Sequence, residues 1–239
     1  GYISLIGRRN VDAHPDRGVN WEVDLPDGRI ASRHGATATF LVPAGNRPVR
    51  ANLGNAVLEA EVSLAPGEAV RREFIIASGQ LVPRAVFAED GAAVGDNVRF
   101  DVLNVKPGVD GQHRTVGTNY GEGKPFDLPP GNYLLRATAG KAVSEIPVTV
   151  KGNESVEPKV VLNAGMLVIS APGANRLDIL EAAQDISGRR KSVGTSYGES
   201  WQVVLPAGNY LVRVRKKDSA QVQETANIKA GVRTTITVR

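Results

Sequence analysis

The stretch that decides the fold occurs three times in this chain, as Val42-Pro43-Ala44-Gly45-Asn46, Leu128-Pro129-Pro130-Gly131-Asn132-Tyr133 and Leu205-Pro206-Ala207-Gly208-Asn209-Tyr210. Each copy follows an earlier glycine, and ten residues lead from that glycine to the Pro-x-Gly glycine in all three copies. No gap is needed to superpose them, so the chain contains an internal repeat. Proline presets φ for a turn and glycine accepts a positive φ, so each copy predicts a tight reversal between two strands. The structural residues of these turns are Pro43, Pro129, Pro206, Gly45, Gly131 and Gly208.

The repeat divides the 239 residues into three units, 1–78, 79–164 and 165–239. Aromatic residues make up 5 % of the chain, which also holds 26 glycines and 14 prolines, a composition typical of an all-β protein with many turns. Alternation in the middle unit predicts about seven strands, as in an immunoglobulin-like sandwich. They are expected near residues 81–87, 98–102, 113–117, 126–128, 133–137, 146–150 and 156–162.

The units follow one another without a flexible linker. Only a pair of small residues, Ser78-Gly79 or Ala164-Gly165, separates the last strand of one unit from the first strand of the next. Because no Gly/Ser-rich or proline-rich segment intervenes, we expect three tandem β-sandwich domains arranged as a rod.

The general composition sets further bounds. The chain has no cysteine, which excludes disulfides and thiolate metal sites. No apolar run approaches the roughly 20 residues that span a bilayer, so we expect no transmembrane segment. The sequence opens at Gly1-Tyr2-Ile3 as the first strand of a repeat, without a visible signal peptide, so we expect it to be part of a longer polypeptide.

The segment 128–135, Leu-Pro-Pro-Gly-Asn-Tyr-Leu-Leu, resembles the hallmark turn of the prealbumin-like sandwiches. These include carboxypeptidase regulatory-like domains, collagen-adhesin B-type repeats and PEGA-type repeats of bacterial surface and envelope proteins. Residues 205–212 match equally well, and residues 42–49 match less well, because Arg47-Pro48 replaces Tyr-Leu. The resemblance implies prealbumin-like domains in a non-catalytic stalk or binding module, located in the periplasm or outside a bacterial cell. Its partner would be a protein or glycan of the envelope, with no nucleic acid and no cofactor.

Some adhesin repeats of that family carry a Lys–Asn isopeptide bond, which needs a lysine on an early strand. The first strands expected here, 1–6, 80–86 and 166–170, contain no lysine. We therefore expect no such cross-link.

The net charge of +4 resides in the third unit. Residues 165–239 carry eleven basic and six acidic side chains, against nine and nine in 1–78 and nine and ten in 79–164. The basic runs Arg189-Arg190-Lys191 and Arg215-Lys216-Lys217 can attract a polyanion or an anionic membrane surface. The alternative is that they are solvated strand ends and hairpin tips.

Two further sets of residues are candidates for binding. Tyr120 and Tyr197 precede equivalent glycines and either pack over the end of a sandwich or, if exposed, suit a sugar ring. Arg50, Arg136 and Arg213 share one repeat position, and strand alternation points them outward. Such a row binds an anionic glycan or keeps a strand face solvated.

Nothing in the sequence indicates catalysis or a metal site. The histidines His14, His34 and His113 would have to converge from different units, and there is no Gly-x-Ser-x-Gly elbow. The glycine-rich loop 117–123 recurs at 194–200 without a following helix, which favours a turn over a phosphate loop. The sequence thus predicts a non-enzymatic stalk or presentation arm of a bacterial envelope or surface protein. The alternative function is a carbohydrate- or polyanion-binding array.

Overall fold

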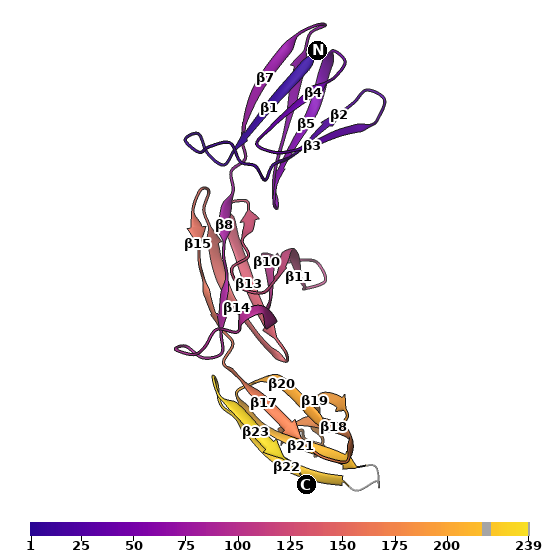
Figure 1. Ribbon diagram of the computed structural model, residues 1–239, viewed down its shortest axis with the longest axis vertical. Coiled ribbons are helices and arrows are strands. Elements are labelled where there is room, and N and C mark those ends of the chain that lie inside the picture. The colour runs from indigo at the N-terminus through magenta and orange to yellow at the C-terminus, as the bar shows by residue number, and fades with distance from the viewer. Residues whose placement is uncertain (217–220, 239) are drawn as a thin grey trace.

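A computed structural model describes residues 1–216 and 221–238, and its regular structure is almost entirely β-strand (Figure 1). The first repeat contains β1 (Tyr2–Arg8), β2 (Asn20–Asp24), β3 (Ile30–His34), β4 (Thr37–Leu41), β5 (Gly45–Leu53), β6 (Ala56–Leu64) and β7 (Ala69–Ile75). The second contains β8 (Gly79–Leu81), β9 (Arg84–Val86), a short 3-10 helix (Gly95–Asn97), β10 (Arg99–Pro107), β11 (His113–Tyr120), β12 (Phe126–Leu128), β13 (Gly131–Ala139), β14 (Ala142–Val150), β15 (Ser155–Val156) and β16 (Lys159–Val161). The third contains β17 (Ala164–Ser170), β18 (Ala174–Gln184), β19 (Arg190–Tyr197), β20 (Ser200–Pro206), β21 (Gly208–Lys216), β22 (Gln221–Ile228) and β23 (Arg233–Thr237). The all-β class predicted from the sequence is confirmed.

One strand arrangement recurs in the three repeats. In the first, a sheet of order β4-β1-β7 packs on a sheet of order β3-β2-β5-β6, and in the third β20-β17-β23 packs on β19-β18-β21-β22. The first and last strands of a repeat pair in parallel, as β1 does with β7 and β17 with β23. The remaining neighbours in these sheets are antiparallel.

The middle repeat has the same arrangement with two interrupted strands. Pro83 separates β8 from β9, and Pro158 separates β15 from β16, because proline has no N–H to give to a ladder. The parallel pairing continues across the breaks through bonds from Val82 N to Val156 O, 2.9 Å, and from Arg84 N to Pro158 O, 3.0 Å. The split strands therefore occupy the places of β1 and β7.

Each repeat encloses its own hydrophobic cluster, built from the inward residues of both sheets. Trp21 on β2, Phe100 on β10 and Leu177 on β18 are fully buried at equivalent places in their repeats. Figure 1 shows the three groups of strands one after another along the long axis, with the N-terminus at one end. No helix in the described part of the chain is long and apolar enough to cross a membrane.

The Pro-x-Gly turns carry the chain from the three-stranded to the four-stranded sheet of each repeat. The predicted positive φ is found at Gly45, +117°, but Gly208 at +159° is nearly extended and Gly131 has no positive φ. The prediction that a left-handed glycine makes every copy of the turn is therefore wrong.

A side chain two residues after the glycine closes each turn instead. The hydroxyl of Tyr133 donates to Pro129 O at 2.8 Å, and that of Tyr210 donates to Pro206 O at 2.9 Å. In the first repeat, Arg47 Nε donates to Pro43 O at 3.0 Å. The Arg47 substitution thus keeps the bond that the tyrosines make.

Candidate functional site

The first junction is formed by the tip of the β5–β6 hairpin, which docks on strand β12 of the second repeat. Asn55 N donates to Asp127 O at 2.9 Å, and Asn55 Nδ2 donates to Val116 O at 2.8 Å. A Cβ added at Gly54 would lie 2.6 Å from Asp127 Cβ, and Gly54 holds a φ of +57°. The hairpin approaches this closely because glycine has no side chain.

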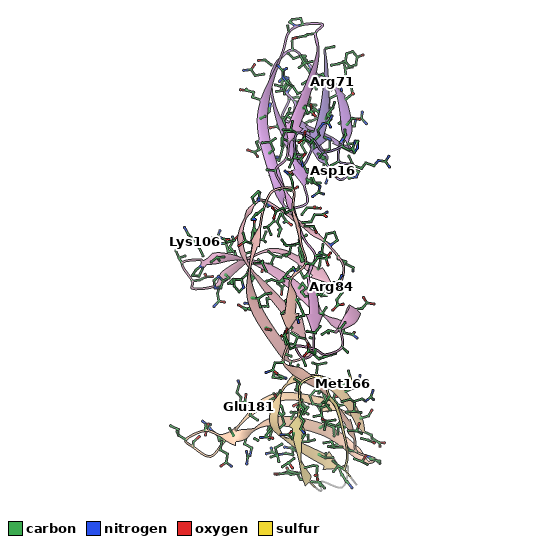
Figure 2. All side chains as sticks on the ribbon, turned by 90° about the vertical axis from the view of Figure 1, so that its left-hand side faces the viewer. Asp16, Arg71, Arg84, Lys106, Met166 and Glu181 are labelled. Carbon is green, nitrogen blue, oxygen red and sulfur yellow. The ribbon has the colours of Figure 1, made fainter. Side chains whose placement is uncertain are left out.

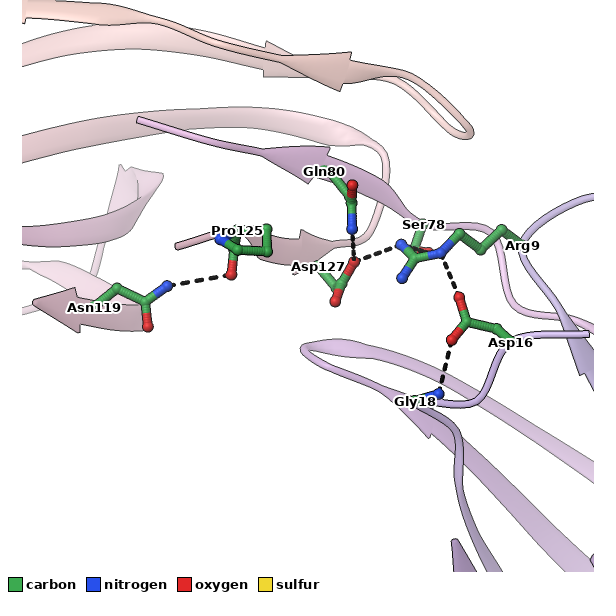
Figure 3. Close-up of polar contacts among 8 residues, drawn as sticks. All are labelled: Arg9, Asp16, Gly18, Ser78, Gln80, Asn119, Pro125 and Asp127. Carbon is green, nitrogen blue, oxygen red and sulfur yellow. Dashed lines mark hydrogen bonds and ion pairs between the residues drawn. The ribbon is translucent and has the colours of Figure 1, made fainter. Parts of the chain in front are cut away.

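Arg9 also contacts Asp127 at this junction (Figure 3). Its guanidinium donates to Asp16 at 2.6 Å, to the buried hydroxyl of Ser78 at 3.2 Å and to Asp127 at 2.5 Å. Gln80 adds a bond to the same Asp127 oxygen at 3.2 Å. Burial alone would lower the pKa of Arg9, and the bonds and charges of Asp127 and Asp16 raise it above its usual value. At the first junction, ion pairs therefore add to the contact made by the hairpin.

The second junction repeats this docking with the β13–β14 hairpin on strand β20. Lys141 N donates to Val204 O at 2.9 Å. A Cβ added at Gly140 would lie 2.8 Å from Val204 O, and Gly140 has the same φ, +57°, as Gly54. Val204 packs against the hydrophobic cluster of the middle repeat, so apolar contact replaces the ion pairs of the first junction.

The glycine that begins each later repeat also meets its surroundings closely. A Cβ at Gly79 would lie 2.2 Å from Lys151 O, and one at Gly165 would lie 2.3 Å from Lys229 O. The covalent connection and the docked hairpin thus hold neighbouring repeats at two separate points, which opposes rotation about the connection. No group of three or more His, Cys, Asp or Glu side chains in the described ranges is placed to hold a metal ion.

The predicted arginine row belongs to polar networks on the outer face of the four-stranded sheets. Arg50 donates to Glu22 at 2.9 Å and to Glu59 at 2.8 Å, and Arg136 donates to Glu145 at 2.6 Å. These cations are neutralised by carboxylates of their own sheets.

In the third repeat the corresponding arginine, Arg213, lies between Asp178 and Gln223 in the sheet register. Its Nε has no hydrogen-bond partner among the described residues. Asp178 is buried and accepts from Thr195 at 2.6 Å and from Arg176 at 2.9 Å. Burial would raise the pKa of Asp178, but these bonds and the nearby charges of Arg176 and Arg215 outweigh burial and lower the pKa below its usual value.

The two basic runs of the third repeat lie apart. Arg215 pairs with Arg176 near the start of β18, whereas Arg190 pairs with Gln184 at its other end. From Arg176 to Gln184 the strand spans about 25 Å. Lys216 ends β21, and Lys217 lies outside the described residues.

The run 189–191 sits on the β18–β19 hairpin among acidic side chains. Lys191 Nζ lies 3.2 Å from Glu181 Oε1, and Arg189 Nε lies 3.6 Å from Asp185 Oδ2. Figure 2 shows Glu181 on this projecting hairpin and Lys106 on the corresponding hairpin of the middle repeat, on the same side of the molecule. The structure therefore does not bring the predicted basic residues into one surface.

The predicted tyrosines are exposed. Tyr120 ends β11 with 62 % of its surface accessible, and Tyr197 ends β19 with 77 % accessible. The interpretation that they pack over the end of a sandwich is wrong, since the strand turns both side chains to solvent. The two rings occupy equivalent places on successive repeats.

Sequence reasoning missed the junction residues. Gly54 and Gly140 share one repeat position, nine residues after the Pro-x-Gly glycine. This shared glycine is the sequence signal that could have indicated a close contact at the hairpin tip. Asp127 and Val204 also correspond, but they have different chemistry, so no residue type marks the docking position.

No family model matches the chain, and no curated protein matches it by sequence. Among solved structures the chain is similar to the Bacillus anthracis TIE protein, at 18 % identity and a TM-score of 0.28. The match covers 100 % of this chain and 50 % of the length of the TIE protein chain. It is similar to GBS52, the minor pilin of Streptococcus agalactiae, at 16 % identity and a TM-score of 0.34, over 67 % of this chain and 94 % of that one. The chain is also similar to a streptococcal ancillary pilin, at 12 % identity and a TM-score of 0.36. That match covers 100 % of this chain and 98 % of the pilin. The matches include pilins, and their low TM-scores describe a distant likeness.

Proposed function

We propose that the chain is a non-catalytic stalk segment, built of three tandem prealbumin-like sandwich domains, 1–78, 79–164 and 165–239, held as a rod. The observation that carries this proposal is the repeated junction, in which Asn55 N and Lys141 N make the same bond to Asp127 O and Val204 O. A chain in which neighbouring domains are joined at two points at each boundary keeps its domains in a fixed orientation. Such a chain can transmit force from one end to the other.

The contacts support a spacer rather than a hinge. Gly54 and Gly140 meet the next repeat at distances that leave no room for a Cβ. Interdomain motion would break this contact together with its hydrogen bond, and at the first junction it would also separate Arg9 from Asp127. The resting state of the chain is therefore the docked one.

The location in the bacterial envelope, in the periplasm or outside the cell, follows from the resemblance of the Pro-x-Gly turns to surface repeats. A stalk in that location presents another segment of the polypeptide to a protein or glycan of the envelope. The role needs no cofactor.

Distance measurement between spin labels tests the rod, because the chain has no cysteine of its own. Glu61→Cys and Thr225→Cys place one label on an exposed strand position of the first repeat and one on the third. The proposal predicts one narrow distance distribution, which broadens when Gly54→Ala and Gly140→Ala are added. A broad distribution in the chain without the alanine substitutions would contradict the rod.

The exposed tyrosines favour a second candidate function, binding of a glycan along the stalk. An aromatic ring that is open to solvent offers a flat apolar face to a sugar, and Tyr120 and Tyr197 do so on two successive repeats. A glycan array probed with the chain and with the double variant Tyr120→Ala and Tyr197→Ala tests it. Signal that is lost in the variant supports glycan binding, and an array without signal removes this candidate.

A further inference from the structure

The docking surface that receives a hairpin on the second and third repeats is also present on the first repeat. Asp127 and Val204 both lie two residues before the turn proline, and the residue at that position in the first repeat is Leu41. Leu41 ends β4, an edge strand of its sheet, and 71 % of its surface is accessible. Within the described residues, nothing covers it.

The neighbours of Leu41 are apolar and exposed as well. Ile30 corresponds to Val116, the second residue that Asn55 contacts at the first junction, and 56 % of its surface is accessible. Tyr2 is the ladder partner of Leu41 and is 52 % accessible. These three residues form the first acceptor face. Clustered apolar side chains of this kind mark an interaction surface.

We propose that the first acceptor face binds a glycine-turn β-hairpin of a further sandwich repeat. The inference rests on the proposed function, since it extends the junction by which the rod is built. The two junctions seen in the structure indicate what this face would bind. At each of them the acceptor strand contacts a hairpin whose glycine has a φ of +57°, and a carbonyl of that strand accepts a hydrogen bond from the N–H of the residue after the glycine.

The chemistry of the face selects between the two kinds of junction. Leu41 stands where the second junction has the apolar Val204 and the first junction has the carboxylate of Asp127, so the first acceptor face resembles the face of the second junction. The expected occupant is therefore a hairpin that docks as Ala139-Gly140-Lys141-Ala142 does, without an ion pair to the acceptor strand.

The sequence of the third repeat does not meet this description. It has Lys217 at the position of Gly54 and Gly140, nine residues after Gly208. A lysine side chain at that place has no room in the contact that both junctions make. We therefore do not expect this chain to bind a second copy of itself end to end through this face.

The test adds one repeat to the complete chain. A second copy of residues 79–164 is placed before Gly1, so that Ala164 precedes Gly1 as it precedes Gly165 in the native sequence. Leu41→Cys reports on the first acceptor face. Val204→Cys, introduced in a separate sample, reports on the native second junction. In both samples the rate at which the new thiol reacts with a maleimide is measured. We expect the thiol at position 41 to react fast in the chain of 239 residues and at least about tenfold more slowly in the extended chain. The thiol at position 204 should react slowly in both.

A matched control carries Gly140→Ala in the added copy only, which should restore the fast reaction at position 41. Equal rates at position 41 with and without the added repeat, while position 204 stays protected, would overturn the inference and leave the proposed function standing. Fast reaction at position 204 would instead show that the native junction is open, so the proposed function itself would fail. Protection of position 41 that grows with the concentration of the unextended chain would identify a second copy as the occupant and overturn the proposal.

Discussion

Single side chains close the turns between the two sheets of each repeat. Tyr133, Tyr210 and Arg47 reach back to the carbonyl of the turn proline, and each bond joins residues four apart in sequence. Burial raises the pKa of both tyrosines, so their hydroxyls stay protonated donors. The polar tip of a buried aromatic thus fixes a turn whose backbone needs no left-handed residue.

Replacing Tyr133 with phenylalanine removes the donor and leaves the Pro129 carbonyl unpaired. We expect Tyr133→Phe to lower the free energy of unfolding of the middle repeat by about 1 kcal/mol, measured by chemical denaturation. Tyr120→Phe removes a hydroxyl from an exposed ring and is the control, with no expected change. Equal midpoints for the two variants would contradict the role of the bond.

The carboxylate of Asp178 makes the stability of the third repeat depend on pH. Because its folded pKa is depressed, its contribution is present above the unfolded value of about 3.9 and is lost as pH falls through the folded pKa. Asp178→Asn should therefore be less stable than the native chain at neutral pH, and the difference should shrink in acid below about pH 4. Thermal unfolding midpoints measured across this range test the prediction. A difference that stays constant with pH would contradict it.

At the scale of residues, burial follows from the sequence more directly than turn chemistry does. Alternation places Trp21, Phe100 and Leu177 inside, because burial follows strand period directly. A side chain that reaches back to a carbonyl has no such period. Arg47 therefore looked like a departure from the motif, although it makes the equivalent bond.

Hairpin tips are the elements that connect the repeats, and their glycines permit the contact. Gly140→Ala adds a Cβ that meets Val204 O, whereas Gly173→Ala adds one at φ +80° with no atom within 4 Å. Both variants bear the strain of a positive φ, so their difference isolates the clash. We expect only Gly140→Ala to speed exchange of the Lys141 amide, measured by NMR. Equal rates in the two variants would contradict the docking.

The two junctions should respond differently to salt. Arg9 and Asp127 hold the first through partly exposed charges, while Val204 holds the second through apolar contact. At 1 M salt the screening length falls to about 3 Å, so the first junction should weaken. We expect faster amide exchange at Asn55 and no acceleration at Lys141. The same response at both amides would contradict the assignment.

At the scale of elements, the sequence predicted the strands but not the docking of each hairpin on the next repeat. The expected segments of the middle repeat appear among β8 to β16, because alternation and turn residues are local signals. Docking depends on which surfaces meet in space. The basic runs show the same limit, since adjacency along the sequence did not predict that β18 separates them.

In the proposed stalk, the length of the whole molecule sets how far it holds another segment of the polypeptide. Each repeat closes a core of its own, so stability is supplied locally, and the junctions add orientation. The first acceptor face extends the same construction by one step. A stalk of this design lengthens by adding repeats without changing the fold of any of them.

Small-angle X-ray scattering of the chain of 239 residues tests the central claim most directly, because shape is what the junctions determine. A compact globule of this length has a radius of gyration of about 18 Å. A rod of three repeats predicts a radius of gyration clearly above this value, with the scattering profile of an elongated particle that is as wide as one sandwich. A radius near 18 Å, with a compact profile, would show that the repeats fold back on one another and would contradict the rod.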